Sequence, residues 1–284
     1  MTRQTANPTP KAGRNLPVAI GVGVGLFVPL TAGLIWAPWF FTLLIAVGLG
    51  LAAVEVHRAL LLKGMRSEVV PIVIGTVVSV LGGYIAGRVD LHISAVGFAA
   101  ICLAATMLAA LTSRLFRGAE GFIRDVSASA FVIAYIPLMG VFVPLLLAAD
   151  HGRLRILIVI ACVVASDTGA FAVGVLFGRH KMAPSISPGK TWEGFAGGVA
   201  VAAAVGAVGV HLLLDTPWWV GLILGALCSL GGTVGDLVES LIKRDAGLKD
   251  MSNFLPGHGG IMDRLDSMLV AVPVGWLVLH LALG

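Results

Sequence analysis

Residues 218–250 read WWVGLILGALCSLGGTVGDLVESLIKRDAGLKD. No charged side chain occurs from Trp218 to Gly235, and charges of both signs then follow at short intervals. A helix needs roughly 20 apolar residues, rising about 1.5 Å each, to cross a bilayer core of about 30 Å. The first part of this stretch therefore predicts a membrane-spanning helix, and the second part predicts a polar segment at a membrane surface.

The whole chain shares this apolar character. It is 58% hydrophobic and 12% charged, and its mean hydropathy is +0.98. A soluble protein of this length needs a polar shell that so few charges do not supply. The pI near 9.2 comes from basic residues scattered over short loops, which is not the pattern of a nucleic-acid patch. We expect an all-α, polytopic integral membrane protein with no nucleic-acid partner.

Nine apolar runs have the length of a transmembrane helix. The expected spans are 16–35, 38–55, 69–87, 91–112, 127–149, 154–177, 192–213, 217–238 and 265–283. Within them, Gly21 and Gly25, or Gly221 and Gly225, have the small-x-x-x-small spacing that lets transmembrane helices approach closely. The spans divide the chain into residues 1–150 with spans 1–5 and residues 151–284 with spans 6–9.

The basic residues predict an orientation. The N-terminus and every second connection hold 16 of the 19 Lys and Arg residues, and the other side holds Arg88, Arg153 and Arg155. Because cytoplasmic loops are enriched in Lys and Arg, the N-terminus and the connection after residue 238 are expected in the cytoplasm. The protein would lie in the cell (plasma) membrane, with its C-terminus outside.

Asp167 stands inside the predicted span 154–177, and Asp236 stands near the inner end of the predicted span 217–238. A charge at the bilayer centre costs about 2.5–3.5 kcal/mol on insertion scales, so such residues usually serve ions, protons or substrates. A structural hydrogen bond or ion pair between helices is the alternative. Asp236, Ser240 and Lys243 are spaced i, i+4, i+7, so they share one helix face if the span continues inward.

The connection after this span holds eight of the 34 charged residues, between Lys243 and Asp266. Asp263 and Asp266 share a face at the start of the last span. The segment NFLPGHGG, 253–260, excludes a regular helix and predicts a tight loop that returns one helix end to the other. Carboxylates suit Mg²⁺, and basic side chains with the backbone of a Gly-rich loop suit phosphate. The mixture predicts a metal and phosphate site; a solvated loop of paired charges is the alternative.

A second loop on the same side contains SPGKT, residues 187–191. Pro188 and Gly189 occupy the central positions of a predicted type II turn, which would present Lys190 and neighbouring hydroxyls. The loop is similar to a phosphate-binding loop, but it lacks the first glycine of a Walker A motif. It therefore predicts phosphate contact without a nucleotide fingerprint.

Together these motifs resemble the signature of the phosphatidate cytidylyltransferase (CDP-diacylglycerol synthase) family. The resemblance lies in S-x-x-K-R-x₄-K-D at 240–250 and P-G-H-G-G-x-x-D-R-x-D at 256–266. The Ser-Asp pair at 166–167 and SPGKTWEG at 187–194 are also similar to that family. Phe171 departs from the family pattern, in which a tyrosine is common, so no phenol is expected to act at that position.

The resemblance implies transfer of CMP from CTP to phosphatidate, which forms CDP-diacylglycerol and pyrophosphate. It also implies Mg²⁺, with a second cation left open, and a homodimer in the membrane whose catalytic region is 151–284. The implied metal ligands are Asp236, Asp263 and Asp266, and the implied catalytic set is Asp236, Asp263, Lys243 and Asp167. The implied substrate-binding residues are Ser187, Lys190, Thr191, Ser240, Lys243, Arg244, Lys249, Asp250, His258, Gly259, Gly260 and Arg264.

Other functions compete with this one. A CTP-dependent lipid kinase, such as a polyprenol kinase, would use related metal and phosphate groups. A CDP-alcohol phosphotransferase would need D-G-x-x-A-R, which the sequence lacks. An ion-coupled transporter would use Asp167 and Asp236, but it would not need the charged loop.

Overall fold

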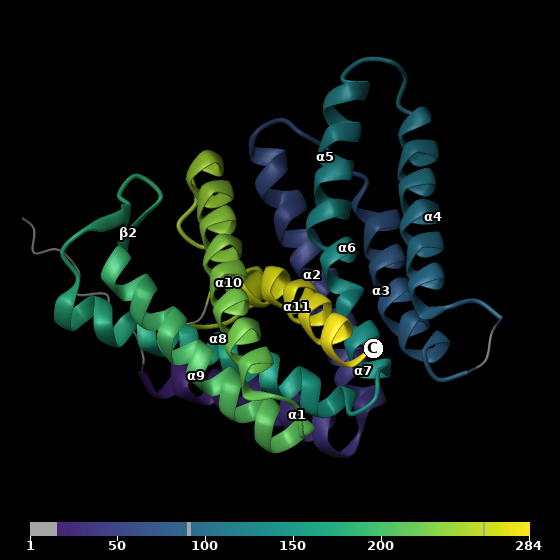
Figure 1. Ribbon diagram of the computed structural model, residues 1–284. Helices are drawn as coiled ribbons and strands as arrows, with labels where there is room; N and C mark the ends of the chain where they lie inside the picture. The colour runs from purple at the N-terminus through teal and green to yellow at the C-terminus, as the bar shows by residue number, and fades with distance from the viewer. Residues whose placement is uncertain (1–15, 90–91, 258) are drawn as a thin grey trace, which may run out of the picture.

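The computed structural model describes residues 16–89, 92–257 and 259–284, and they form a bundle of helices with one small hairpin (Figure 1). The elements are α1 (Leu16–Trp36), α2 (Pro38–Leu62), α3 (Val69–Ala86), α4 (Ala95–Leu115), α5 (Phe122–Tyr135), α6 (Pro137–Gly140), α7 (Phe142–Ala148), α8 (Gly152–Phe177), β1 (Lys181–Ala183), β2 (Ser187–Thr191), α9 (Trp192–Leu214), α10 (Trp218–Ala246) and α11 (Met262–Leu283).

The predicted all-α membrane fold is confirmed. Eight segments of the described chain are long and apolar enough to cross a membrane, and α1 lies where the first of the nine predicted spans was expected. One of the eight, Phe122–Ala148, is divided into α5, α6 and α7. Pro137 explains the first break, because proline has no N–H to donate and its ring clashes with the preceding turn.

The helix α10 continues past the predicted span end at 238 and stops at Ala246. Gly247 ends it with a φ of 72°, a left-handed conformation that glycine adopts without a steric penalty. The N–H of Leu248 then donates to the carbonyl of Lys243 at 2.7 Å. Asp236, Ser240 and Lys243 therefore stand on one continuous helix, as their predicted shared face requires.

Connections rich in Lys and Arg meet at one end of the bundle. Lys63, after α2, forms an ion pair with Asp245 of α10 at 3.1 Å, and the N–H of Arg66 donates to Asp125 of α5 at 3.1 Å. The α2–α3 and α4–α5 connections and the hairpin lie at the top of Figure 1, and the α1–α2 and α7–α8 connections lie at the bottom. This arrangement agrees with the predicted alternation of basic and non-basic connections.

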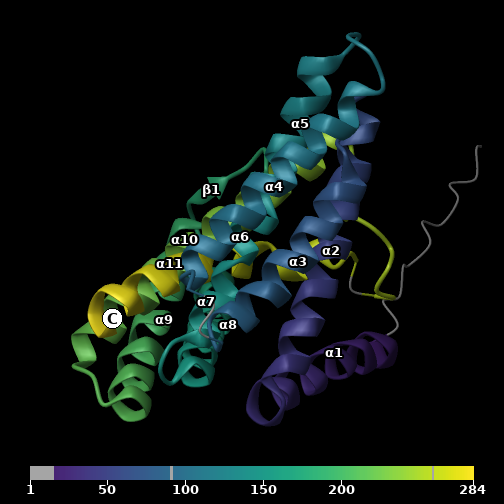
Figure 2. The same cartoon turned by 90° about the vertical axis from the view of Figure 1, so that its right-hand side faces the viewer.

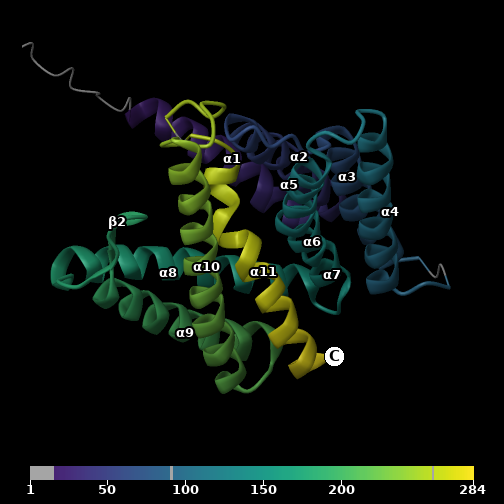
Figure 3. The same ribbon diagram turned by 90° about the horizontal axis from the view of Figure 1, so that it is seen from above.

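Two hydrophobic cores hold the two halves of the chain together. The first contains Val56 of α2, Val132 of α5 and Met262 of α11. The second contains Val159 of α8 and Leu224 of α10, together with residues of α2 and α7. Figure 2 shows α1 beside α2 at the edge of the bundle, and Figure 3 shows α10 and α11 side by side where α8 and α9 cross them. The C-terminal helices are therefore packed directly against the N-terminal ones.

The small-x-x-x-small spacing brings two helices of the chain into close contact at one of its two predicted positions. A Cβ at Gly221 would lie 2.1 Å from the carbonyl oxygen of Gly206, and one at Gly225 would lie 2.0 Å from that of Ala202. These glycines let α9 and α10 approach closely. Gly21 and Gly25 have open space around them, so no helix of the described chain packs closely at that spacing in α1.

The predicted type II turn at 187–191 is also wrong. Pro188 and Gly189 lie inside β2, which pairs antiparallel with the shorter β1, and the turn falls at 184–186. A type II turn needs a positive φ at Gly189, which this glycine does not have. The register of the two strands shifts between their paired residues, and a proline is tolerated at such a bulge or on a strand edge. Strand pairing has overridden the local turn preference.

Candidate active site

The ends of α10 and α11 meet through a partly buried lysine. The Nζ of Lys243 donates to Oδ1 of Asp263 at 2.7 Å, and Lys243 also forms an ion pair with Glu239. The side chains of Lys243, Asp263 and Glu239 are 13%, 5% and 0% exposed. The sequence predicted that carboxylates of the last two membrane helices converge beside Lys243, and the structure has this arrangement.

Asp263 also holds the loop between these helices. Its Oδ2 accepts the N–H of Met251 at 2.9 Å and the N–H of Gly260 at 2.7 Å. With Lys243 on Oδ1, both carboxylate oxygens already have donors. Asp263 therefore links α10, the loop and the first turn of α11, where an acidic side chain is favoured by the helix dipole.

A group of three carboxylates lies next to this link. Asp236, Glu239 and Asp266 each offer an oxygen, and these atoms all lie within 4.8 Å of one another. Glu239 forms an ion pair with Lys243. Its buried carboxylate oxygens have no other hydrogen-bond donor among the described residues. Carboxylates this close repel one another unless a cation or a proton intervenes. The donor set therefore suits a divalent cation, for which acidic oxygens are the usual ligands.

This group differs from the predicted metal set. Asp236 and Asp266 were expected in it, but Glu239 was not, and Asp263 has the ammonium and backbone partners described above. Glu239 follows Asp236 by three residues, a spacing that places both on one helix face. That spacing, at the end of a predicted span, was the signal that sequence reasoning missed.

The β-hairpin lies against the same part of α10. Lys190 of β2 forms an ion pair with Oδ2 of Asp236 at 2.7 Å, and Nε of Arg244 donates to the carbonyl of Ile186 at 3.3 Å. Thr191 then caps α9, because its Oγ1 accepts the N–H of Gly194 at 3.1 Å. The predicted Lys190 is therefore brought to the carboxylates by a hairpin instead of a turn.

Two further side chains lie within electrostatic range of members of this carboxylate group. Asp167 of α8 interacts with Asp236, with Asp266 and with Lys190. The phenol of Tyr135, in α5, interacts with the same carboxylates, and its buried hydroxyl has no hydrogen-bond partner among the described residues. Nothing in the apolar sequence FVIAY around Tyr135 pointed to the site.

The other predicted residues surround this centre. The Oγ of Ser240 donates to Oδ1 of Asp236 at 3.3 Å. Gly259 closes the loop by exchanging two backbone hydrogen bonds with Leu255, and Ser187 is part of β2. The residues exposed at the rim are Arg244, Lys249, Asp250 and Arg264. His258 lies outside the described residues.

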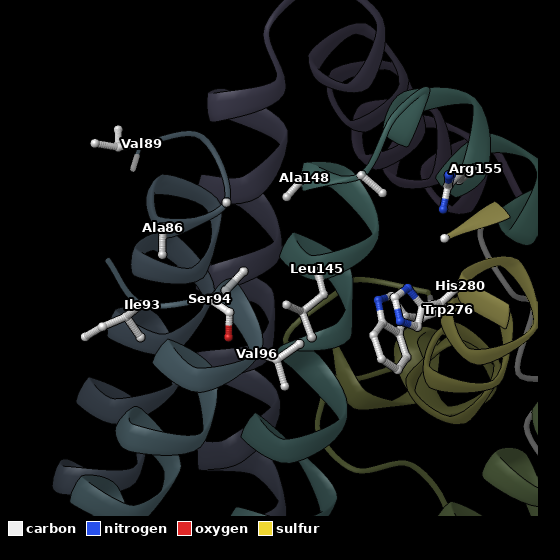
Figure 4. A pocket seen from close by; sticks show the side chains of 14 residues that line it. Ala86, Val89, Ile93, Ser94, Val96, Leu145, Ala148, Arg155, Trp276 and His280 are labelled. Carbon is white, nitrogen blue, oxygen red and sulfur yellow. The ribbon is translucent and has the colours of Figure 1, made fainter. Parts of the chain in front are cut away.

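A separate cavity of about 410 Å³ lies at the other end of the bundle (Figure 4). Its walls come from the ends of α3 and α7, the beginnings of α4 and α8, and α11, and they include Arg155, Trp276 and His280. No residue predicted to act in the reaction lines this cavity. The candidate site is therefore the charged centre at the α10–α11 end.

Comparison with known proteins gives the class of this chain. Its sequence matches the cytidylyltransferase family over residues 18–282. The chain belongs to this family and is a nucleotidyltransferase embedded in a membrane.

Named relatives are similar to this chain over nearly its whole length or over part of it. It is 38% identical to the phosphatidate cytidylyltransferase of Mycobacterium leprae over 290 residues, covering 98% of this chain and 92% of that protein. It is 38% identical to the phosphatidate cytidylyltransferase of Mycobacterium tuberculosis H37Rv, covering 98% and 87%. The enzyme of that name from Bacillus subtilis is 44% identical over 124 residues, covering 43% of this chain and 46% of that protein.

Proposed function

We propose that this chain transfers CMP from CTP to the phosphate of phosphatidate, forming CDP-diacylglycerol and pyrophosphate. The observation that carries the proposal is the meeting of three carboxylates and two lysines where the hairpin, α10 and α11 come together. Its support is the similarity, over nearly the whole chain, to relatives named for this reaction. The proposed catalytic region is 151–284, with the spans of 1–150 as its support.

Asp236, Glu239 and Asp266 are the proposed ligands of Mg²⁺, which would offset the charge that develops on the transferring phosphate. This set replaces Asp263 by Glu239, because Asp263 is already bonded to Lys243 and to two backbone N–H groups. A second cation, if the reaction uses one, is assigned to the side of Asp167.

The chain's own residues have a definite task in this reaction. The attacking oxygen belongs to a phosphate that is already ionised at neutral pH, so a strong general base is not needed. The difficulty is to bring two anions together, which positioning and neutralising charge overcome. Lys190 and Lys243 stand beside the carboxylates, and the basic rim would receive the phosphates of CTP and lipid.

The proposed setting is the inner surface of the cell membrane. The basic connections are assigned to the cytoplasm by the positive-inside rule, which puts the candidate site where CTP and the lipid phosphate meet.

A homodimer, implied by the family resemblance, belongs to the same proposal. Light scattering of the purified protein in detergent measures it, and a mass of one chain per particle would contradict it.

Labelled CTP tests the reaction itself. Purified protein is incubated with phosphatidate, Mg²⁺ and CTP labelled at either the α- or the γ-phosphate. Label from the α-position is expected in the lipid product, and label from the γ-position is expected in pyrophosphate. Label passing from the γ-position to lipid would instead identify a CTP-dependent lipid kinase, and no lipid product with either label would contradict both.

Lys190→Met is expected to raise KM for CTP by about tenfold or more, since a charge-assisted hydrogen bond to phosphate is lost. Steady-state rates at varied CTP, with phosphatidate in detergent micelles, give this value. Lys181→Met is the matched control, because Lys181 is exposed on the neighbouring strand. Unchanged kinetics for Lys190→Met would remove this lysine from the site.

A further inference from the structure

Glu55 is a buried carboxylate in the N-terminal half, and its partners lie in the C-terminal half. It stands on α2 and is 4% exposed. Its Oε1 accepts the Oγ of Ser252 at 2.6 Å and the N–H of Ile261 at 3.0 Å, and its Oε2 accepts the N–H of Met262 at 2.8 Å. All three donors belong to the loop between α10 and α11 or to the first residues of α11.

These contacts give a hydrogen-bond acceptor to backbone N–H groups that the loop and the start of α11 leave without one. The first N–H groups of a helix have no partner within it, and a negative charge there is favoured by the helix dipole. Ile261 precedes α11 and Met262 begins it, so Glu55 supplies from α2 the cap that the loop does not provide. A buried carboxylate is tolerated when it is hydrogen-bonded in this way.

Gly260 lies against the same carboxylate of Glu55. A Cβ at this position would lie 2.6 Å from Oε2 and 2.8 Å from Oε1 of Glu55. Its φ is not among the positive values of the described chain, so the backbone conformation does not require glycine here. The carboxylate of Glu55 is what leaves no room for a side chain.

The contact leads directly to the candidate site. The N–H of Gly260 donates to Asp263, and Asp263 holds Lys243. Asp266 follows Asp263 after three residues of the same helix, so both move with the start of α11. A shift of the loop would therefore displace Asp266, of the three-carboxylate group, together with Asp263, the partner of Lys243.

We propose that Glu55 is a positioning residue for CMP transfer: it holds the segment from Ser252 to Met262, so that Asp263 and Asp266 stand correctly against α10. The inference rests on the proposed function and assigns a task to the N-terminal spans. Glu55 acts through the loop and touches neither the lysine nor the three carboxylates in any described hydrogen bond or ion pair.

Glu55→Ala, in the full-length protein, is expected to lower kcat by about 10²-fold, because a misplacement near 1 Å is enough for such a loss. KM for CTP should change by less than about threefold, since Lys190 of β2 and Arg244 of α10 lie outside the segment that Glu55 holds. Glu55→Gln keeps an accepting oxygen and should recover roughly tenfold of the lost rate. Loss through KM alone, or no loss, would overturn the proposal.

Glu68→Gln is the matched control. Glu68 accepts the Oγ of Ser113 at 2.8 Å and pairs with Arg117, so it is another partly buried carboxylate at the same end of the bundle. The described partners of its carboxylate lie on α4 and in the α4–α5 connection, away from the α10–α11 loop. Its loss should lower the melting temperature and leave kcat unchanged. An equal fall in kcat for both variants would reduce Glu55 to a structural role.

A double-mutant cycle with Gly260→Ala separates positioning from general damage. Alone, Gly260→Ala crowds the carboxylate and should lower kcat by about tenfold or more. In the Glu55→Ala background the new methyl group has room, so the double variant should be about as fast as Glu55→Ala alone. Independent, multiplying losses would show that the two residues do not act on each other.

Hydrogen exchange distinguishes failure of this inference from failure of the proposed function. In Glu55→Ala the amides of Ile261 and Met262 should exchange faster, whichever reaction the protein catalyses. An unmodified protein that makes no CMP-bearing lipid would contradict the proposed function alone. An active protein whose variant keeps its full kcat, or keeps slow exchange at these amides, would contradict the positioning role alone.

Discussion

Asp236→Asn is expected to lower the rate of CMP transfer by about 10³-fold or more while the protein still inserts into membranes. Asp236 is the member of the three-carboxylate group that also holds Lys190. Asparagine removes one of three negative charges, and the metal contribution to transition-state stabilisation is worth several kcal/mol, or about tenfold for each 1.4 kcal/mol. The rate is measured with phosphatidate and CTP at saturating Mg²⁺.

Mn²⁺ binding, followed by electron paramagnetic resonance without substrate, provides a second measurement. The Mn²⁺ affinity of Asp236→Asn should fall with the rate, and the rate of the Lys190→Met variant measures how much of the loss of rate comes from the ion pair alone. Asp245→Asn is the control, because this exposed aspartate of the same helix pairs with Lys63. A rate or an affinity near that of the unmodified protein would remove Asp236 from the metal ligands.

Much of the fold follows from patterns within short segments. The apolar runs are as long as a bilayer requires, so the spans were predictable from length and composition. The described residues of the segment 253–260 form no helix, as predicted, and Gly257 and Gly259 have a positive φ that a helix excludes. The meeting of Lys243 with Asp263 then follows from two helices joined by a tight return.

Interactions over long distances along the chain were not predictable in this way. Glu55 is separated by 197 to 207 residues from its hydrogen-bond partners, and no local pattern indicates such a contact. Glu239 was missed for another reason: it stands one residue past the predicted span end at 238, so it was not among the acids found inside predicted spans. The SPGKT segment has the residues of a type II turn, but pairing between β1 and β2 competes with that preference and wins.

Asp263→Asn separates the two roles that sequence and structure suggest for this residue. If Asp263 positions Lys243 and the loop, the rate should fall by about 10³-fold, because breaking a buried ion pair leaves an uncompensated charge. Mn²⁺ affinity should stay within about threefold of the unmodified value, since the three other carboxylates remain. If Asp263 is a metal ligand, as the resemblance implies, affinity should fall as it does in Asp236→Asn.

The lysine provides the remaining control for this variant. Asp263 and Lys243 form one unit through the 2.7 Å hydrogen bond, so losses in Asp263→Asn and Lys243→Met should not multiply in the double variant. Removing the lysine also leaves Glu239 without its ion-pair partner, which should raise Mn²⁺ affinity because more negative charge faces the metal. Losses that multiply in the double variant would contradict an arrangement in which Asp263 holds the lysine. A fall in Mn²⁺ affinity when Lys243 alone is replaced would contradict neutralisation of the carboxylates by the lysine.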